Sequence, residues 1–140
     1  MEENIEDNKF EKAWEKQYSL LQKHGWIIHD VAGTGCHTHG LRENFDHLDL
    51  EVAFNMPGDT AHRVLAAAVK NIKKGKRYED GQKCDQVIDN DEVLFIKSKR
   101  RERQMLRIIL PDPQGLFPGD PGCQEEYTAQ LYQEKQPPLG

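Results

Sequence analysis

The sequence predicts an α+β domain with a mixed, mainly antiparallel sheet of five or six strands and two main helices packed against it. Two stretches carry apolar residues at helical spacing, and several short runs are rich in β-branched and aromatic residues. The connections between these stretches are short, which favours helices packed on an antiparallel sheet. A chain of 140 residues fits one modest core. We therefore expect a single domain over residues 1–123 and a C-terminal extension over residues 124–140, with a disordered end.

The first half of the chain predicts one helix and three extended segments. Apolar residues spaced by four, four and three positions indicate a helix over Phe10–Leu21. The β-rich run Trp26–Val31 is typical of a strand, and Cys36–Leu41 is a short extended candidate. Arg42–Asp46 is expected to be a turn. Apolar and polar residues then alternate over His47–Phe54, which predicts a half-buried strand.

The second half predicts the clearest helix and the remaining strands. Asp59 is a favourable N-cap, an apolar stripe follows, and Gly75 is a typical C-terminal stop. We then expect one or two strands over Cys84–Lys97 with a hairpin turn at Asp89–Asp91, followed by a loop or exposed helical turn over Lys97–Arg103. Met105–Leu110 predicts a central strand. A Pro- and Gly-rich loop then reaches Gly122, and a short helix is expected over Gln124–Gln133.

Composition excludes several classes of protein. Lys and Arg number 19 against 24 Asp and Glu, and the net charge of -5 argues against a nucleic-acid-coating protein. No apolar run approaches the roughly 18–20 residues of a membrane-spanning helix. The acidic segment Met1–Asp7 is not a secretory signal. The three cysteines form no Cys-x-x-Cys pair, so we expect reduced thiols in a cytoplasmic protein without membrane contact.

Histidines and carboxylates form the most suggestive pattern. His37 and His39 are two residues apart, so on a strand they point to the same face, roughly 7 Å apart. If the next strand pairs with this one across the turn, His39 lies opposite Asp49, and His37 lies opposite Glu51. His47 then falls on the same surface. Such a group suits a divalent transition metal such as zinc, with Asp49 or Glu51 as a base; ordinary cross-strand pairs on a solvated face are the alternative.

Two further features carry candidate ligand-binding residues. The basic run around Lys99, Arg100 and Arg101 suits phosphate or another small anionic ligand, although a solvated surface is the simpler explanation. In the Pro- and Gly-rich loop, Asp112 is a candidate to orient a histidine or to bind a ligand. A turn aspartate that bonds to nearby backbone N–H groups is the alternative.

Three segments resemble the bacterial family named domain of unknown function 4262. They are His24-Gly25-Trp26, then Thr38-x-Gly40-Leu41 with His47-x-Asp49-Leu50, and finally Pro111-Asp112-x-x-Gly115-x-Phe117-Pro118. The resemblance covers about residues 24 to 123 and implies no established activity. It implies that a common site would include Thr38, His47, Asp49, Asp112 and Phe117. The family usually has an aromatic residue at position 37 and a branched apolar residue at position 39, so those histidines are particular to this chain.

Two functions follow as hypotheses. The first is a non-catalytic module that binds a small anionic ligand or a protein partner, since no complete catalytic motif is present. The second is a metal-dependent, hydrolase-like enzyme whose ligands are His37, His39 and His47. The candidate catalytic residues are Asp49, Glu51 and Asp112, and the candidate ligand-binding residues are Lys99, Arg100, Arg101, Thr38 and Phe117.

Overall fold

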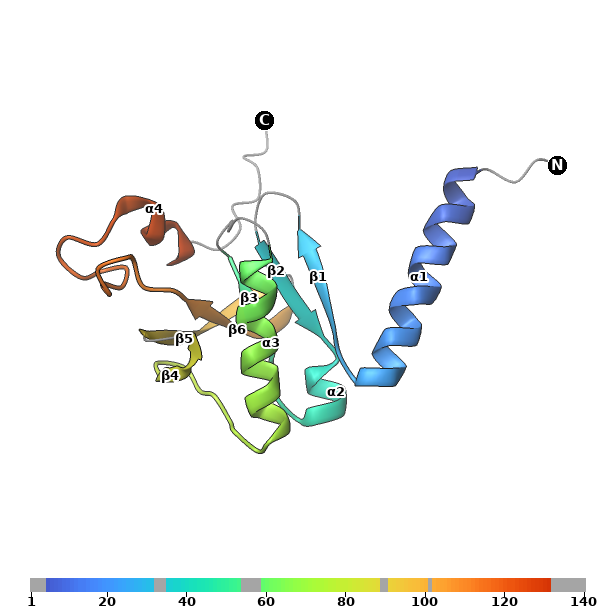
Figure 1. The fold of residues 1–140 in the computed structure, drawn as a ribbon, viewed down its shortest axis with the longest axis horizontal. Coiled ribbons are helices and arrows are strands. Elements are labelled where there is room, and N and C mark those ends of the chain that lie inside the picture. Colours follow the sequence, from blue (N-terminus) through green and yellow to red (C-terminus); the bar gives the residue numbers. More distant parts are fainter. Residues whose placement is uncertain (1–4, 32–34, 54–58, 89–90, 101, 132–140) are drawn as a thin grey trace.

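The computed structural model confirms the α+β class and describes residues 5–31, 35–53, 59–88, 91–100 and 102–131 (Figure 1). Side chains are described from residue 15 onward, residues 31 and 100 excepted. A six-stranded sheet has the strand order β1-β2-β3-β6-β5-β4. The elements are α1 (Ile5–His24), β1 (Ile27–Val31), β2 (Gly35–His39), α2 (Leu41–Phe45), β3 (Asp49–Val52), α3 (Thr60–Lys73), β4 (Lys83–Ile88), β5 (Asp91–Arg100), β6 (Arg103–Ile109), α4 (Glu125–Thr128) and a 3-10 turn (Ala129–Leu131).

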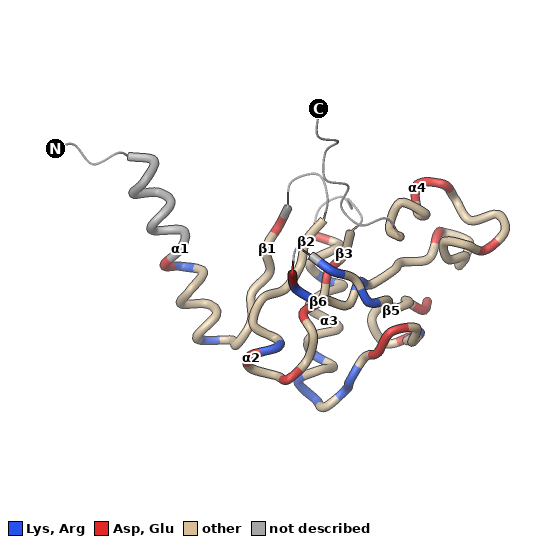
Figure 2. Tube along the Cα trace, turned by 180° about the vertical axis from the view of Figure 1, so that it is seen from behind, with Lys and Arg blue, Asp and Glu red and all other residues tan. Residues whose placement is uncertain are grey.

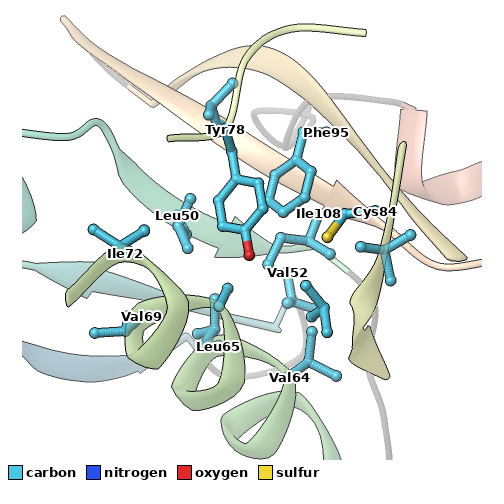
Figure 3. Close-up of a cluster of buried hydrophobic side chains, with 14 of the residues drawn as sticks. Leu50, Val52, Val64, Leu65, Val69, Ile72, Tyr78, Cys84, Phe95 and Ile108 are labelled. Carbon is cyan, nitrogen blue, oxygen red and sulfur yellow. The ribbon is translucent and has the colours of Figure 1, made fainter. Parts of the chain in front are cut away.

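Helix α3 covers one face of the sheet and forms the apolar core (Figure 3). Its buried stripe is the one that the sequence spacing predicts, because every third or fourth residue is apolar. Leu65 is fully buried in this cluster, together with Leu50 of β3 and Phe95 of β5. Tyr78 stacks on Phe95, with ring centroids 4.1 Å apart. The core therefore lies between α3 and the middle of the sheet.

One parallel pairing joins the two halves of the sheet. β3 and β6 run parallel, with Leu50 opposite Leu106, whereas the other neighbouring strands are antiparallel. The chain leaves β3, passes through α3 to the far edge of the sheet, and returns by two hairpins to place β6 beside β3. The prediction of a central strand over Met105–Leu110 is confirmed. Segments distant in sequence thus meet along β6.

Two segments differ from the sequence-based prediction. Arg42–Asp46 was expected to be a turn, but residues 41–45 form the short helix α2. Lys97–Arg103 was expected to be a loop or a helical turn, but β5 continues to Arg100, which pairs with Arg103 of β6. Its charged side chains are compatible with a strand because alternate residues of an exposed hairpin face solvent. Phe54 and the turn residues 89–90 lie outside the described residues.

Two glycines allow β2 to sit closely between its neighbours. Gly35 has φ 114°, and a Cβ there would meet the Val52 carbonyl oxygen at 1.9 Å. Gly40 has φ 106°, and its Cβ would lie 2.5 Å from the Gly25 carbonyl oxygen. Side chains disfavour this left-handed conformation, and no space remains for one at either position. Both ends of β2 therefore require glycine.

The two ends of the described chain contact the domain differently. α1 projects away from the sheet (Figure 1), and Tyr18 on it is 53% exposed. In contrast, Gln130 is fully buried near the end of β6. Its side-chain amide accepts a bond from the Leu110 N–H at 2.7 Å and donates one to the Leu110 carbonyl at 2.8 Å. Among the described helices, none has an apolar stretch long enough to cross a bilayer.

Candidate metal centre

The sheet face opposite α3 carries a row of polar side chains across four strands. The register places His29 of β1 opposite His37 of β2, and His37 opposite Glu51 of β3. Glu51 in turn lies beside Arg107 of β6. The predicted pairing of His37 with Glu51 is thus confirmed. Because strand residues alternate between faces, His39 lies on the same face as His37.

Three of the six histidines gather on this face. The ring centroids of His29 and His39 are 4.3 Å apart, and those of His37 and His39 are 4.8 Å apart. The Nε2 atoms of His37 and His39 lie 3.0 Å from each other. One ring nitrogen from each of the three residues lies within 4.8 Å of the other two. A single small ion is therefore within reach of all three imidazoles after small side-chain shifts.

This geometry is close to that of a tetrahedral zinc site. Two imidazole nitrogens bound to one zinc at about 2.0–2.1 Å are separated by roughly 3.3 Å. The separation of 3.0 Å between His37 and His39 is near that value. The Nε2 atom of His29 is buried and has no hydrogen-bond partner among the described residues. Such an orphaned nitrogen is costly to bury, and a bound ion would satisfy it.

His29 was not predicted from the sequence to be a site residue, although a signal was present. Within the predicted strand Trp26–Val31, Ile28 packs against the core, so His29 faces the other side. A hairpin between this strand and the next would have placed His29 opposite His37. The strand was predicted, but its pairing partner was not. The third histidine therefore follows from topology rather than from a motif.

Arg103 connects the histidines to Asp49. Its Nη2 atom donates to Asp49 Oδ2 at 2.7 Å and to Glu43 Oε1 at 3.2 Å, and its Nη1 atom lies 3.3 Å from His39 Nδ1. Because arginine only donates, His39 Nδ1 must be the acceptor, and the proton of the neutral ring then lies on Nε2, toward His37. In this state a proton between the two Nε2 atoms holds them together.

Asp49 is almost completely buried and accepts several hydrogen bonds. Thr38 Oγ1 donates to its Oδ1 at 2.8 Å, and the Leu41 N–H donates to the same oxygen at 3.0 Å. Burial raises the pKa of Asp49 above its ordinary value, although these bonds and the Arg103 guanidinium act in the opposite direction. Thr38 and Asp49 therefore join the end of β2 to the start of β3.

Glu51 forms a buried ion pair. Its Oε1 accepts bonds from Arg107 Nε at 2.8 Å and from Ser98 Oγ at 2.6 Å. Arg107 also donates through Nη1 to the Gln130 carbonyl at 2.8 Å. Both charges of the pair are nearly inaccessible to solvent. The carboxylate thus has two strong donors and lies directly beside His37 in the sheet.

A pocket of about 600 Å³ opens over the three imidazoles. Besides the histidines and Thr38, its lining includes Arg42 from α2, Glu102 from the β5–β6 turn, and Arg103 and Met105 from β6. Figure 2 shows Lys, Arg, Asp and Glu positions along β5 and β6, two strands of the sheet, of which β6 lies beside β3. The imidazoles are therefore reachable by a small molecule.

His47 does not share the expected surface, so that prediction was wrong. Its Nε2 accepts a bond from the Tyr78 N–H at 3.0 Å, and its Nδ1 lies 2.8 Å from the Leu48 carbonyl. The reason is that β3 begins only at Asp49, which frees His47 from the strand alternation. Burial is the main cause that lowers the pKa of His47. This residue fastens the chain after α3 to the core.

Asp112 organises the loop that follows β6. Its Oδ1 accepts bonds from the N–H groups of Gln114 and Leu116, and its Oδ2 from that of Gln124. Burial acts to raise the pKa of Asp112, but these three bonds together lower it below its ordinary value. Phe117, in the same loop, is buried, and Lys83 Nζ lies 4.9 Å from its ring centroid. Neither Asp112 nor Phe117 lines the histidine pocket.

The basic residues lie apart from the imidazoles as far as they are described. Ser98 points toward Glu51, so alternation directs Lys99 to the opposite face, where it is exposed. Arg101 and the side chain of Arg100 lie outside the described part of the chain. Arg103, which ends the basic run, is the member that reaches the pocket.

A second group with metal-ligand chemistry lies on the α3 side of the hairpin. Asp30, Cys36 and His62 bring one donor atom each within 4.8 Å of the others. His62 Nε2 already lies 2.5 Å from Asp30 Oδ1, at the surface. Burial, followed by the charge of Asp30, raises the pKa of Cys36 to about 11. The thiol is therefore protonated at neutral pH, and the histidine cluster is the stronger candidate.

Comparison with known proteins agrees with the resemblance noted in the sequence. The model of the family "Domain of unknown function (DUF4262)" matches residues 20–124, which is well over half of the chain. No curated protein and no solved structure matches significantly. The matched region contains the whole sheet, the pocket and the loop around Asp112. The chain therefore belongs to the DUF4262 family of domains of unknown function.

Proposed function

We propose that this protein binds a divalent transition metal ion of the zinc class through His29, His37 and His39. The observation that carries the proposal is the convergence of three imidazoles, with one buried ring nitrogen of His29 lacking a partner in the described structure. Neutral imidazole nitrogens are preferred ligands of zinc and its neighbours in the first transition series. Hard ions such as magnesium prefer oxygen ligands.

Three protein ligands leave one position of a tetrahedral ion open. Sites of this kind bind water or an exogenous ligand, whereas structural zinc sites have four protein ligands. The pocket over the imidazoles provides space for such a ligand. The proposed function is therefore reversible binding of a small molecule at a metal centre, rather than stabilisation of the fold by a closed metal site.

Hydrolysis by a metal-bound water is the alternative, and the carboxylates argue against it. Asp49 is engaged by Arg103, Thr38 and the Leu41 N–H. Glu51 is engaged by Arg107 and Ser98. A general base needs an accessible lone pair within reach of the water, whereas both carboxylates are buried and held by fixed donors. Binding therefore accounts for the site better than hydrolysis does.

The test is zinc binding by protein produced without a histidine tag. Isothermal titration should give one tight site, and alanine at position 29, 37 or 39 should weaken it by at least about a hundredfold, because two imidazoles seldom hold zinc tightly. At free zinc near a thousand times Kd, stability should rise by about 4 kcal/mol. Binding should weaken below about pH 6, where protons compete for the imidazoles.

Two matched variants serve as controls. His47→Ala removes a buried histidine outside the cluster, and His62→Ala removes the histidine of the Asp30–Cys36 group. Both should keep the tight site. His37→Phe imitates the aromatic residue usual in the family at this position and should lose it. Equal zinc affinity in wild type and His29→Ala would refute the proposal, as would loss of binding only in His62→Ala.

A further inference from the structure

We propose that the metal and Arg103 together bind a small organic oxyanion, a carboxylate or a phosphate ester, and that metal binding prepares Arg103 for this role. This inference rests on the proposed metal site and names the class of ligand that it takes. The contact of Arg103 with His39, the charges around the pocket and the pocket's size each support it.

The first step concerns the two nitrogens of His39. A neutral imidazole has a single nitrogen lone pair in the ring plane, so it cannot bind a metal through Nε2 and accept a bond at Nδ1. When the proton of the neutral ring is on Nε2, Nδ1 accepts from Arg103 Nη1 at 3.3 Å. When Nε2 coordinates an ion, the proton moves to Nδ1, and two donors face each other. The Nη1 group of Arg103 must then turn away from His39.

The second step concerns the direction in which the Nη1 group of Arg103 points once it has turned away from His39. Arg103 Nη2 is anchored by Asp49 at 2.7 Å and by Glu43 at 3.2 Å, so the guanidinium stays at the pocket edge. Because Arg103 is part of the pocket lining, the pocket is the nearest place where the Nη1 group can donate a hydrogen bond to an acceptor. A guanidinium with one anchored edge and one free edge is a favourable partner for an oxyanion.

The third step concerns charge. Three neutral imidazoles leave the charge of a divalent ion uncompensated, unlike ligand sets that contain thiolates or carboxylates. Arg42 and Arg103 add two positive charges to the pocket lining, and Glu102 contributes one negative charge. Glu43 and Asp49 offset part of the Arg103 charge from outside the lining. The metal-loaded pocket is therefore net positive, which favours an anionic ligand.

The volume of the pocket limits the class of ligand that it can bind. The pocket volume of about 600 Å³ is within the range of small-molecule sites and far larger than inorganic phosphate needs. Met105 supplies an apolar wall beside the charged groups. The ligand is therefore an organic molecule with one oxyanion directed to the ion and Arg103, and with an uncharged body in the remaining space.

The experiment uses the full-length protein loaded with cobalt(II), whose visible spectrum reports changes in its ligands. Phenyl phosphate and benzoate, each with one oxyanion and an uncharged body, are the two probes, which separate phosphate-ester from carboxylate recognition. At saturating cobalt, at least one probe should change the spectrum saturably at millimolar concentration. In metal-free protein, followed by thermal shift, the same probe should bind at least about tenfold more weakly.

Variants separate this inference from the metal site itself. Arg103→Lys keeps a positive charge but loses the forked geometry, so probe affinity at saturating cobalt should fall at least tenfold. Lys99→Ala, on the opposite face, should bind cobalt and probe as wild type does. If cobalt gives no ligand-field bands, the metal site is wrong. If the bands appear but neither probe alters them, or if Arg103→Lys binds the probes as tightly as wild type, only the oxyanion inference is wrong.

Discussion

The two faces of the sheet around β3 are both buried, but by different chemistry. On the α3 side, Leu50 and Val52 enter an apolar core (Figure 3). On the other side, Asp49 and Glu51 are just as inaccessible but are held by arginine donors. Apolar burial is non-directional and tolerates small shifts, whereas a buried charge requires its partner at a fixed place. The polar face therefore holds groups in defined positions, as a binding site requires.

The first prediction breaks the polar face. Glu51→Leu removes the acceptor of Arg107 and leaves a buried guanidinium unpaired, so stability should fall by about 3–5 kcal/mol. Urea denaturation of the metal-free protein measures this loss. The double variant Glu51→Leu with Arg107→Met removes both charges and should recover at least half of it. A single variant as stable as wild type would show that the pair is not buried as described.

The second prediction perturbs the apolar face. Leu65 of α3 is completely buried, so Leu65→Ala should cost about 2–5 kcal/mol by loss of burial and creation of a cavity. Unlike the Glu51 loss, this one should not be recoverable by a single partner substitution, because many neighbours share the contact. Urea denaturation compares Leu65→Ala with Ala66→Ser, a small change at an exposed position of the same helix. Similar losses in both variants would contradict the assigned orientation of α3.

The third prediction concerns His47, which lies at the edge of the apolar face. His47→Ala leaves the buried Tyr78 N–H without an acceptor and should cost about 1–3 kcal/mol. His47→Gln, whose Oε1 can accept this bond, should recover part of the loss. Zinc affinity should be unchanged in both variants, whereas substitutions of His29, His37 or His39 in the proposed metal centre should weaken it.

The same residue predicts a pH dependence of stability. The folded-state pKa of His47 is lowered, chiefly by burial, so folding favours the neutral ring. Its stabilising contribution is complete above the unfolded-state pKa of about 6.5 and is lost as pH falls through the folded value. The stability difference between wild type and His47→Gln should therefore shrink as pH is lowered from 7 toward 5. A difference that stays constant would show that the ring titrates normally.

Periodicity was sufficient to predict the apolar face but not the polar one. The α3 stripe and the presence of a strand at β3 follow from local spacing and are confirmed, but the prediction that this strand is half-buried was wrong, because all four of its residues are buried. The pairing of β3 with β6 involves residues more than fifty positions apart, and no local pattern identifies it. Arg103 and Arg107, which hold Asp49 and Glu51, were therefore not recognised as partners from the sequence. The role of a buried charged residue therefore depends on partners that are distant in the sequence.

The candidate site was predicted in part for the same reason. His37 and His39 follow from strand alternation, and their face is confirmed by the register with Glu51. His29 required the pairing of β1 with β2, which sequence spacing alone left open. His47 was assigned to the same face because the strand was expected to begin two residues earlier than β3 does. An error of two residues in the predicted start of this strand thus placed His47 in the candidate site.

The smallest predicted effect lies outside both buried faces. Lys99 is exposed, and its backbone pairs with Gln104 whatever its side chain is. Lys99→Ala should therefore change stability by no more than about 0.5 kcal/mol, as measured by urea denaturation. A loss above 1 kcal/mol would mean that the basic run makes contacts that the described residues do not explain. A small loss of stability in Lys99→Ala and a large loss in Glu51→Leu would show that a charged side chain contributes to the stability of this protein where it is buried and paired.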